Sequence, residues 1–291
     1  MRSTRGTRMG LGGLVTATAA GLVLLGPAAA SGAAAPQSRS LRAPSGYEIV
    51  RVGPIQAPSR SMQKISCPLG KVAVSGGVDM AAPNVLVRSA PTADGKGWEV
   101  VVANPPNSAY GSAGGAPVDL KMHAVCMPQP AGYAIATNTV TNVTSSTRVQ
   151  TGCPGSGTVV LGVGGTAQGE APVTGLSALY IDQASGVANA ALNQTSAGNN
   201  KLDVYAICAQ PPAGYERFTG PLLTVPNPTT NNSITCPSGK TGLSIGMNVP
   251  GARGLIRTIA PGADSSSWTF AGFNGYNTSN YQAAGSLVCA S

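Results

Sequence analysis

The sequence has few charged residues, few aromatic residues and a single histidine. Charged side chains make up 10% of the 291 residues and aromatic ones 4%, whereas charged residues are about 25% of an average globular protein. The Lys and Arg residues stand one at a time without interleaved aromatics, so the clustered basic face of a nucleic-acid-binding protein is not expected. The surface is expected to consist mainly of hydroxyl and amide groups.

The single histidine, His123, limits the catalysis that the chain can support. It is the only base available to a serine or cysteine triad, and the cysteines are expected to be oxidised. In the repeat described below its counterparts are Tyr205 and Ser286, so we interpret it as a strand residue that points from a sheet. The GLSIG segment 242–246 matches the nucleophile-elbow pattern, but its register places it in a strand rather than at a strand-to-helix turn.

Acidic residues are equally scarce. None of the ten Asp and Glu residues forms a repeated pair, and nothing selects Glu99 with Asp182, or Asp79 with Asp94, as the two carboxylates of a glycosidase. The LGVGG segment lacks the Lys-Ser and helix that follow a phosphate-binding loop. We therefore expect no enzyme and no cofactor, and a secreted hydrolase ranks third among our hypotheses.

A long apolar run occurs only at the start of the chain. Residues 1–30 have the pattern of an export signal, with three arginines, an apolar stretch over 11–25 and small residues before the expected cleavage after Ala30. No later segment approaches the roughly 20 apolar residues of a membrane-spanning helix. We expect a secreted, extracellular protein whose formal charge falls from +8 to 8 − 3 = +5, with a flexible tail over 31–43.

What the chain has in abundance is repetition. ISCPLGKVAVSGG from Ile65 returns as TGCPGSGTVVLGVGG from Thr151 and as ITCPSGKTGLSIG from Ile234. A PSGY or PAGY motif precedes the Cys-Pro of each copy by 20, 20 and 21 residues, and each copy closes on a second Cys. We predict three units of about 80 residues, covering 44–129, 130–211 and 212–291.

The units are predicted to be all-β. Short segments rich in β-branched residues alternate with Pro, Gly and Asn, and no segment after the signal has a helical period. Only six residues separate Cys126 from Tyr133, so the units are expected to pack closely, either as a pseudo-threefold β-prism or as a compact row of small β-sandwiches. The glycine pairs 76–77 and 164–165 are expected to permit a bulge or sharp bend.

The six cysteines are expected to form disulfides within the units. Six cysteines allow 15 pairings, but each unit has one early Cys-Pro and one late Cys. Pairing between neighbouring units would leave an unmatched Cys at each end unless the units closed into a ring. We predict the pairs Cys67–Cys126, Cys153–Cys208 and Cys236–Cys289. No two cysteines lie close together with a histidine at ligand spacing, so no metal site is expected.

Aromatic and amide side chains supply the candidate ligand contacts. Trp98 and Trp268 occupy equivalent positions, and a Trp beside amides and hydroxyls can stack on a sugar ring. The alternative, which we favour, is that each Trp covers the core of its unit. Tyrosines in the polar loops are the better candidates for exposed contacts. The candidates are Trp98, Trp268, Asn104, Asn274, Tyr110, Tyr276 and Tyr281.

The order of CP-x-G, glycine-rich strand, Asn and closing Cys, in three copies, resembles the vitelline membrane outer layer protein family. The residues that carry the resemblance are Cys67-Pro68, Gly70, Cys236-Pro237 and Gly239. It implies a threefold β-prism of Greek-key sheets and a structural or carbohydrate-binding role in an extracellular coat, with no catalytic residues to carry over. The pattern is also similar to CP-x-G modules in exported proteins of high-GC Gram-positive bacteria, which imply no particular activity.

Two function hypotheses therefore come first. One is a secreted, non-catalytic protein that binds carbohydrate, cell wall or another surface through its repeated units, because three weak sites on one rigid body raise avidity. The other is a structural or interaction protein with an extracellular protein partner. Its partner site, including an inhibitory one, would be the insertion 108–117, which only the first unit has.

Overall fold

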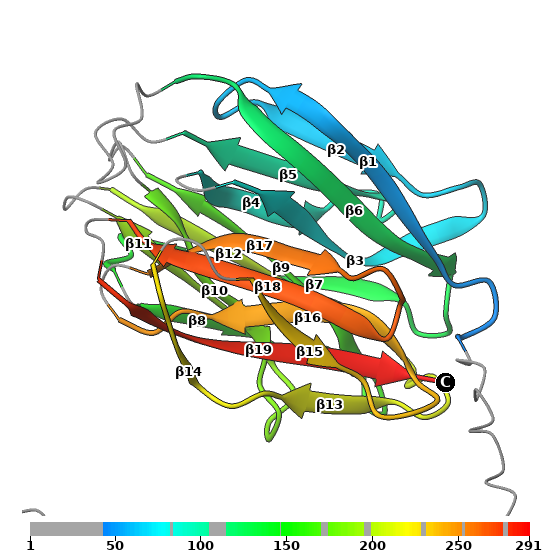
Figure 1. The fold of residues 1–291 in the computed structure, drawn as a ribbon. Coiled ribbons are helices and arrows are strands. Elements are labelled where there is room, and N and C mark those ends of the chain that lie inside the picture. Colours follow the sequence, from blue (N-terminus) through cyan, green and yellow to red (C-terminus); the bar gives the residue numbers. More distant parts are fainter. Residues whose placement is uncertain are drawn as a thin grey trace, which may run out of the picture. The chain divides into compact units, whose positions relative to one another are not determined.

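The computed structural model describes residues 43–81, 84–104, 115–145, 147–169, 174–194, 199–227, 231–251, 254–275 and 279–291. Within these ranges the chain forms nineteen strands and no helix (Figure 1). Accordingly, none of the described residues belongs to a helix that could cross a membrane. The prediction of an all-β fold is confirmed.

The strands are described here by the predicted unit in which each of them lies. The first unit contains β1 (Glu48–Ala57), β2 (Met62–Ser66), β3 (Lys71–Met80), β4 (Val85–Pro91), β5 (Gly97–Ala103) and β6 (Val118–Pro128). The second contains β7 (Ala134–Thr141), β8 (Arg148–Thr151), β9 (Val159–Gln168), β10 (Thr174–Ile181), β11 (Ala188–Gln194) and β12 (Lys201–Ala209). The third contains β13 (Glu216–Thr219), β14 (Leu223–Val225), β15 (Asn232–Thr235), β16 (Thr241–Asn248), β17 (Gly254–Pro261), β18 (Ser267–Asn274) and β19 (Tyr281–Ala290).

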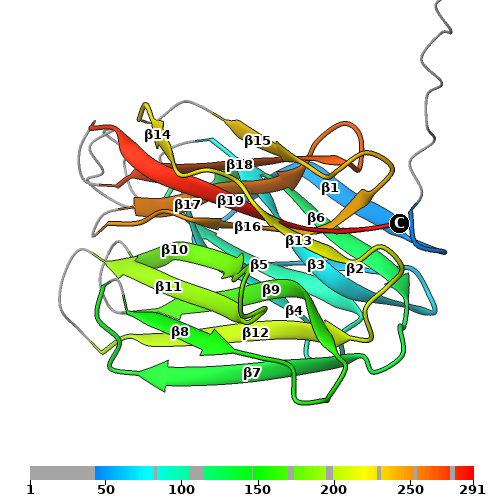
Figure 2. The same ribbon diagram turned by 90° about the horizontal axis from the view of Figure 1, so that it is seen from below.

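Three sheets are shared between the units in a cyclic order (Figure 2). Sheet A runs β1-β6-β3-β17-β18-β15, sheet B runs β2-β5-β4-β9-β12-β7, and sheet C runs β13-β19-β16-β10-β11-β8 with β14 also paired to β19. Each sheet thus takes strands from two units. A row of separate sandwiches would keep the strands of a unit in sheets of its own, so the observed order is compatible with the β-prism.

The strands that follow the early Cys of each unit, β3, β9 and β16, contact one another at the centre. We call these the central strands. The Ser75 Oγ donates a hydrogen bond of 2.5 Å to the Leu243 carbonyl oxygen, from β3 to β16. A Cβ atom on Gly162 of β9 would overlap the carbonyl oxygen of Val74 on β3. The three backbones therefore approach closely enough that only small side chains fit between them.

Each central strand also carries a β-bulge, at Val74, Leu161 and Leu243, where one residue is skipped in the pairing with the last strand of the unit. The glycine pairs singled out in the sequence lie after these bulges rather than in them, so the bulge was expected in the wrong place. The expectation that a side chain would clash at these glycines is confirmed. Gly77, and Gly246 at the equivalent position of β16, serve another purpose: a Cβ on either would overlap a carbonyl oxygen of the neighbouring unit, on β17 or β10 respectively.

The tyrosines of the PSGY and PAGY motifs fasten the units together. The Tyr47 hydroxyl donates to the Gly242 carbonyl oxygen at 2.8 Å, that of Tyr133 to Ala73 at 3.0 Å, and that of Tyr215 to Val160 at 2.9 Å. Each bond runs to the central strand of the preceding unit in the cyclic order. Burial raises the pKa of all three hydroxyls, that of Tyr133 to about 12, so they remain protonated donors.

Each disulfide joins the last strand of a unit to the segment just before the central strand of the same unit. The pairs are Cys67–Cys126, Cys153–Cys208 and Cys236–Cys289, as predicted, with Cα–Cα distances of 5.6, 5.5 and 5.8 Å. These distances lie in the ordinary range for disulfides. The loops that they close span 59, 55 and 53 residues, and a loop of this size contributes about 4 kcal/mol in the chain-entropy model.

Candidate functional site

The two tryptophans do not form ligand platforms. Trp98 and Trp268 are both 0% exposed, so the sugar-stacking hypothesis is wrong for them and the core alternative is confirmed. Each ring lies over a glycine of a central strand, Gly76 or Gly242, where a Cβ would overlap it. The Trp98 Nε1 donates to the Ser89 Oγ at 2.9 Å. A buried, hydrogen-bonded indole cannot stack on a ligand.

The other candidates are also not gathered into a site. Tyr281 is 6% exposed, and its hydroxyl accepts a hydrogen bond of 3.2 Å from the Gly272 backbone N–H, so the expectation of an exposed contact is wrong there. Asn104 and Asn274 are half-buried at strand ends. Tyr110, Tyr276 and most of the insertion 108–117 lie outside the described residues.

The outer faces of the sheets instead carry related hollows where two units meet. In sheet A, β3 pairs with β17; in sheet B, β9 pairs with β4; and in sheet C, β16 pairs with β10. The last strand of a unit lies beside each of these joints and presents His123, Tyr205 or Ser286 opposite a glycine of the central strand. The same backbone geometry therefore presents three different sets of side chains.

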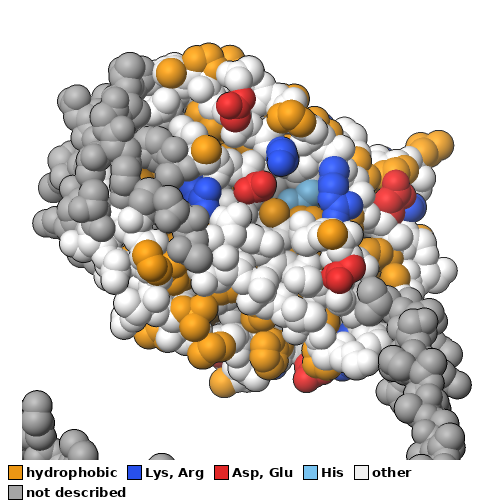
Figure 3. All heavy atoms as spheres, in the orientation of Figure 1, with side chains coloured by type: hydrophobic (Ala, Val, Ile, Leu, Met, Phe, Trp, Pro, Cys, Tyr) orange, Lys and Arg blue, Asp and Glu red, His pale blue; other side chains and the backbone are white. Residues whose placement is uncertain are grey.

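Hollow A, on sheet A, has a volume of about 250 Å³ and is lined by Arg51, Asp79, Lys121, His123 and Pro261 among others. In Figure 3 the only histidine is drawn in pale blue in a depression with blue and red charged side chains around it. Residues come from four strands, β1, β3, β6 and β17. The hollow is thus a joint product of the first and third units.

His123 forms the floor of hollow A. It is 3% exposed, its ring packs edge-on against Trp268 at 5.5 Å between centroids, and its Nε2 has no hydrogen-bond partner among the described residues. Burial, and secondarily the positive charge of Arg51, lowers the pKa of His123 to about 3. The imidazole is therefore neutral near pH 7, with one donor and one acceptor nitrogen.

The charged groups of hollow A are two cations and one carboxylate. The Arg51 Nη2 donates to the Gly262 carbonyl oxygen at 3.1 Å, which holds the guanidinium at the side of the hollow. The Lys121 Nζ lies 4.0 Å from the Asp79 Oδ2, and its side chain is 64% exposed. The Thr258 hydroxyl donates to the Asp79 Oδ1 at 3.3 Å. With His123 neutral, these side chains carry a net charge of 2 − 1 = +1.

Hollow C, on sheet C, has nearly the same volume, about 260 Å³, but a different lining. Thr219 stands where sheet A has Arg51, Asn248 where it has Asp79, and Ser286 where it has His123. Its one acid, Asp182, accepts hydrogen bonds from the Ser185 backbone N–H and hydroxyl at 2.7 Å, which lower the pKa of the carboxyl. Hollow C therefore offers hydroxyl and amide groups rather than cations.

The equivalent position on sheet B is occupied by Arg88. Its guanidinium donates to the Glu99 Oε2 at 2.7 Å and to the Thr166 hydroxyl at 2.6 Å, and it lies 5.6 Å from the centre of the Tyr205 ring. At the corresponding position of β10 stands Ala178. The long side chain of Arg88 thus fills the joint on sheet B, whereas the short side chain of Ala178 leaves the corresponding joint on sheet C open.

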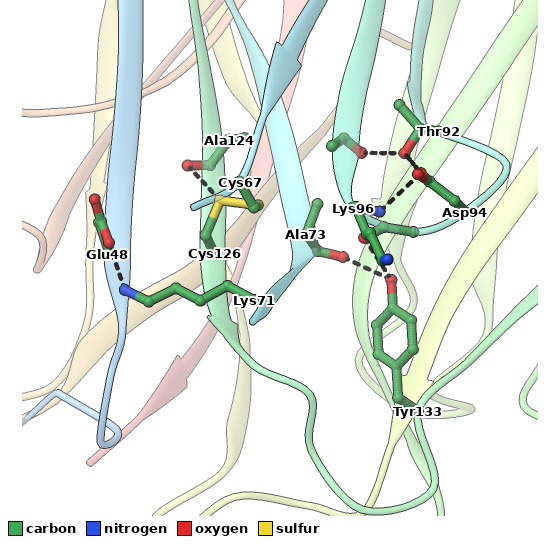
Figure 4. The surroundings of a disulfide bond; sticks show 12 residues. Glu48, Cys67, Lys71, Ala73, Thr92, Asp94, Lys96, Ala124, Cys126 and Tyr133 are labelled. Carbon is green, nitrogen blue, oxygen red and sulfur yellow. Dashed lines mark hydrogen bonds and ion pairs between the residues drawn. A yellow bond between two sulfur atoms is a disulfide. The ribbon is translucent and has the colours of Figure 1, made fainter. Parts of the chain in front are cut away.

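A third, wider hollow of about 560 Å³ lies beside the CPLGK segment and the first disulfide, whose surroundings are drawn in Figure 4. It is lined by Lys64, Lys71 and Lys96 with Asp94. Lys71 forms an ion pair with Glu48, and hydrogen bonds from the Thr92 hydroxyl and the Lys96 backbone N–H lower the pKa of Asp94. We call it the end hollow. It contains surface lysines but no buried polar group left unpaired among the described residues.

Catalytic candidates find other uses in the fold. The GLSIG segment lies in β16, where Ser244 is 2% exposed, and not at a strand-to-helix turn. Glu99 is paired with Arg88. In the part of the chain that the structure describes, no three His, Cys, Asp or Glu residues are gathered so as to hold a metal ion.

Arg51 and Lys121 were not predicted from the sequence as site residues, and Asp79 was considered only as a possible glycosidase carboxylate. For Lys121 a signal was available: the closing segments KMHAVC, DVYAIC and AGSLVC differ in residue type at their first and third positions. No protein-family model matches the chain, and no curated protein matches it either. The site is therefore argued from its own geometry.

Proposed function

We propose that this protein is a secreted, non-catalytic β-repeat protein that binds carbohydrate or other cell-surface or cell-wall material through hollows A and C. The observation that carries the proposal is their recurrence at equivalent unit joints with polar but different linings. Each volume is below the roughly 300–1,000 Å³ of pockets that enclose drug-sized ligands, so each suits one unit of a polymer rather than a large free molecule.

Three features support a binding role outside the cell. The three disulfides, with no free cysteine among the described residues, suit an oxidising compartment. Hydroxyl, amide and guanidinium groups are the partners that saccharide hydroxyls and acidic groups require. Two separate hollows on one disulfide-bonded body allow a polymer or a surface to be held by several weak contacts.

The test is retention of the exported protein on insoluble polysaccharides and bacterial cell walls. We expect the wild type to be retained. We expect Arg51→Gln combined with Lys121→Gln, or Asn248→Leu, to lower the retained fraction severalfold while the melting temperature stays within a few degrees. Lys64→Gln removes one positive charge at the end hollow instead and is the matched control.

Three results would contradict the proposal. Absence of wild-type retention on all of these materials would favour an extracellular protein partner. Undiminished retention of a variant altered in both hollows would exclude these surfaces. A loss confined to Lys64→Gln would place the binding in the end hollow.

A further inference from the structure

Hollow A differs from hollow C in charge, and the difference selects a class of ligand. Resting on the proposed function, we propose that hollow A binds an oxyanion group, a phosphate or a carboxylate carried by a polysaccharide, between Arg51, Lys121 and His123. Hollow C would take the neutral part of such a polymer. The charge on the ligand is thereby assigned to one face of the molecule.

Arg51 has the donors that an oxyanion needs. Only its Nη2 makes a hydrogen bond to the described residues, to the Gly262 carbonyl oxygen. That bond orients the planar guanidinium and leaves its remaining N–H groups for a ligand. Two parallel N–H groups of arginine match two oxygens of a carboxylate or phosphate, which gives direction as well as charge.

Lys121 is the second cation, and it is only loosely held. Its Nζ lies 4.0 Å from the Asp79 Oδ2, whereas a hydrogen bond between such groups spans about 2.7–2.9 Å. Asp79 is also the acceptor for the Thr258 hydroxyl. The exposed ammonium group can therefore turn to a ligand while Asp79 keeps a partner.

His123 supplies an independent sign that the hollow is a site. Its buried Nε2 lacks a hydrogen-bond partner among the described residues, and buried polar atoms are rarely left so in native structures. The charged groups around the imidazole are Arg51 from β1, Asp79 from β3 and Lys121 from its own strand, while β18 contributes the uncharged Trp268 ring. An anion placed here would offset the repulsion from Arg51 and raise the pKa of His123.

The repeat provides an internal control. The positions of Arg51 and Lys121 are held by Thr137 and Asp203 on sheet B and by Thr219 and Ala284 on sheet C. Neither of the other joints therefore has this pair of cations. Among the three equivalent joints, anion selectivity should therefore belong to hollow A alone.

The experiment uses the fact that the chain has one histidine, so that isotope-labelled imidazole gives a single set of NMR signals. The exported protein is titrated at constant ionic strength with inorganic phosphate, with glucuronate and with glucose. We expect the His123 signals to shift saturably with phosphate, glucuronate or both, but not with glucose, and the pKa of His123 to rise in the bound state. Phosphate and glucuronate arms distinguish the two sources of negative charge.

Variants make the test specific. Arg51→Gln and Lys121→Gln should each raise the midpoint of the titration at least fivefold, whereas Lys64→Gln should leave it unchanged. Equal shifts in wild type and Arg51→Gln, or no shift with either anion, would overturn the oxyanion site. If the wild type is nevertheless retained on polysaccharide, only the oxyanion site fails; if retention is absent as well, the proposed function fails with it.

Discussion

The central strands and the outer faces of the sheets follow opposite rules. At the centre, the same residue recurs in all three units: a glycine at 77, 164 and 246, and a tyrosine hydroxyl that reaches the preceding unit. On the faces, equivalent positions carry His123, Tyr205 and Ser286. Packing thus imposes one solution at the centre, whereas the faces are free to differ, and their differences are where specificity is expected.

The largest effect should come from Gly246→Ala at the centre. The new Cβ would overlap the Leu179 carbonyl oxygen and lie against the Tyr180 Cα atom, both backbone atoms that cannot turn aside. We expect a loss of about 3 kcal/mol or more in the free energy of unfolding, at the upper end for overpacking, measured by urea denaturation. Gly152→Ala is the matched control, because its Cβ would meet only the Val187 side chain at 3.6 Å. Similar stability of both variants would refute the close approach of the units.

A face residue, His123, should make stability depend on pH. Its folded-state pKa of about 3 lies below its ordinary value of 6.5, so the unfolded chain binds the proton more readily between these values. The contribution of the neutral His123 side chain to the free energy of unfolding is complete above pH 6.5 and is lost as the pH falls toward 3. Between pH 7 and pH 4 the wild type should lose about 3 kcal/mol more than His123→Gln. Parallel pH profiles for the two proteins in urea denaturation would contradict a buried neutral imidazole.

The next effect concerns Arg88, the long side chain that fills the joint on sheet B and pairs with Glu99. Arg88→Ala removes the partner of Glu99, whose side chain is 18% exposed. Loss of a partner from a mostly buried pair, discounted for this exposure, should cost about 2 kcal/mol of unfolding free energy. Adding Glu99→Gln should restore part of it, because the unpaired charge is then gone. A double variant no more stable than Arg88→Ala would show that the ion pair is not what this position provides.

The smallest effects should come from Tyr47→Phe, Tyr133→Phe and Tyr215→Phe. Each removes one hydrogen bond between units and should lower the free energy of unfolding by about 1 kcal/mol. Equal losses in the three variants are the sharpest sign of equivalent units at the centre. If one of these variants unfolds with the same free energy as the wild type, the hydrogen bond of that tyrosine hydroxyl is worth no more than its hydrogen bond to water in the unfolded chain.

The strand content and the disulfides could be predicted from the sequence because both depend on features internal to one unit. Each unit has its own early and late Cys, and each has short β-branched segments between turn residues. The sharing of strands between units could not be predicted, because the joint between Val78 and Ile259 consists of ordinary apolar strand residues. Nothing in such residues specifies which unit they will meet.

The candidate site was harder to predict for the same reason. Arg51, Asp79 and Lys121 stand far apart in the sequence and in no motif, and only the cyclic sheet order brings them to one hollow with Pro261. Trp98 drew attention because polar residues surround it in the sequence, yet the room left by Gly76 buries it. Exposure of a large ring depends on such tertiary space, which local sequence does not reveal.

The most direct test compares a face variant with a central one in the same two assays, retention on cell walls or polysaccharide and melting temperature. The face variant is Arg51→Gln with Lys121→Gln and Asn248→Leu, and the central variant combines Tyr47→Phe, Tyr133→Phe and Tyr215→Phe, whose losses should add to about 3 kcal/mol. The account predicts that the face variant loses retention at an unchanged melting temperature, while the central variant melts several degrees lower and is retained like the wild type. The opposite pattern, with retention following stability and not the hollows, would contradict the division between a folding centre and binding faces.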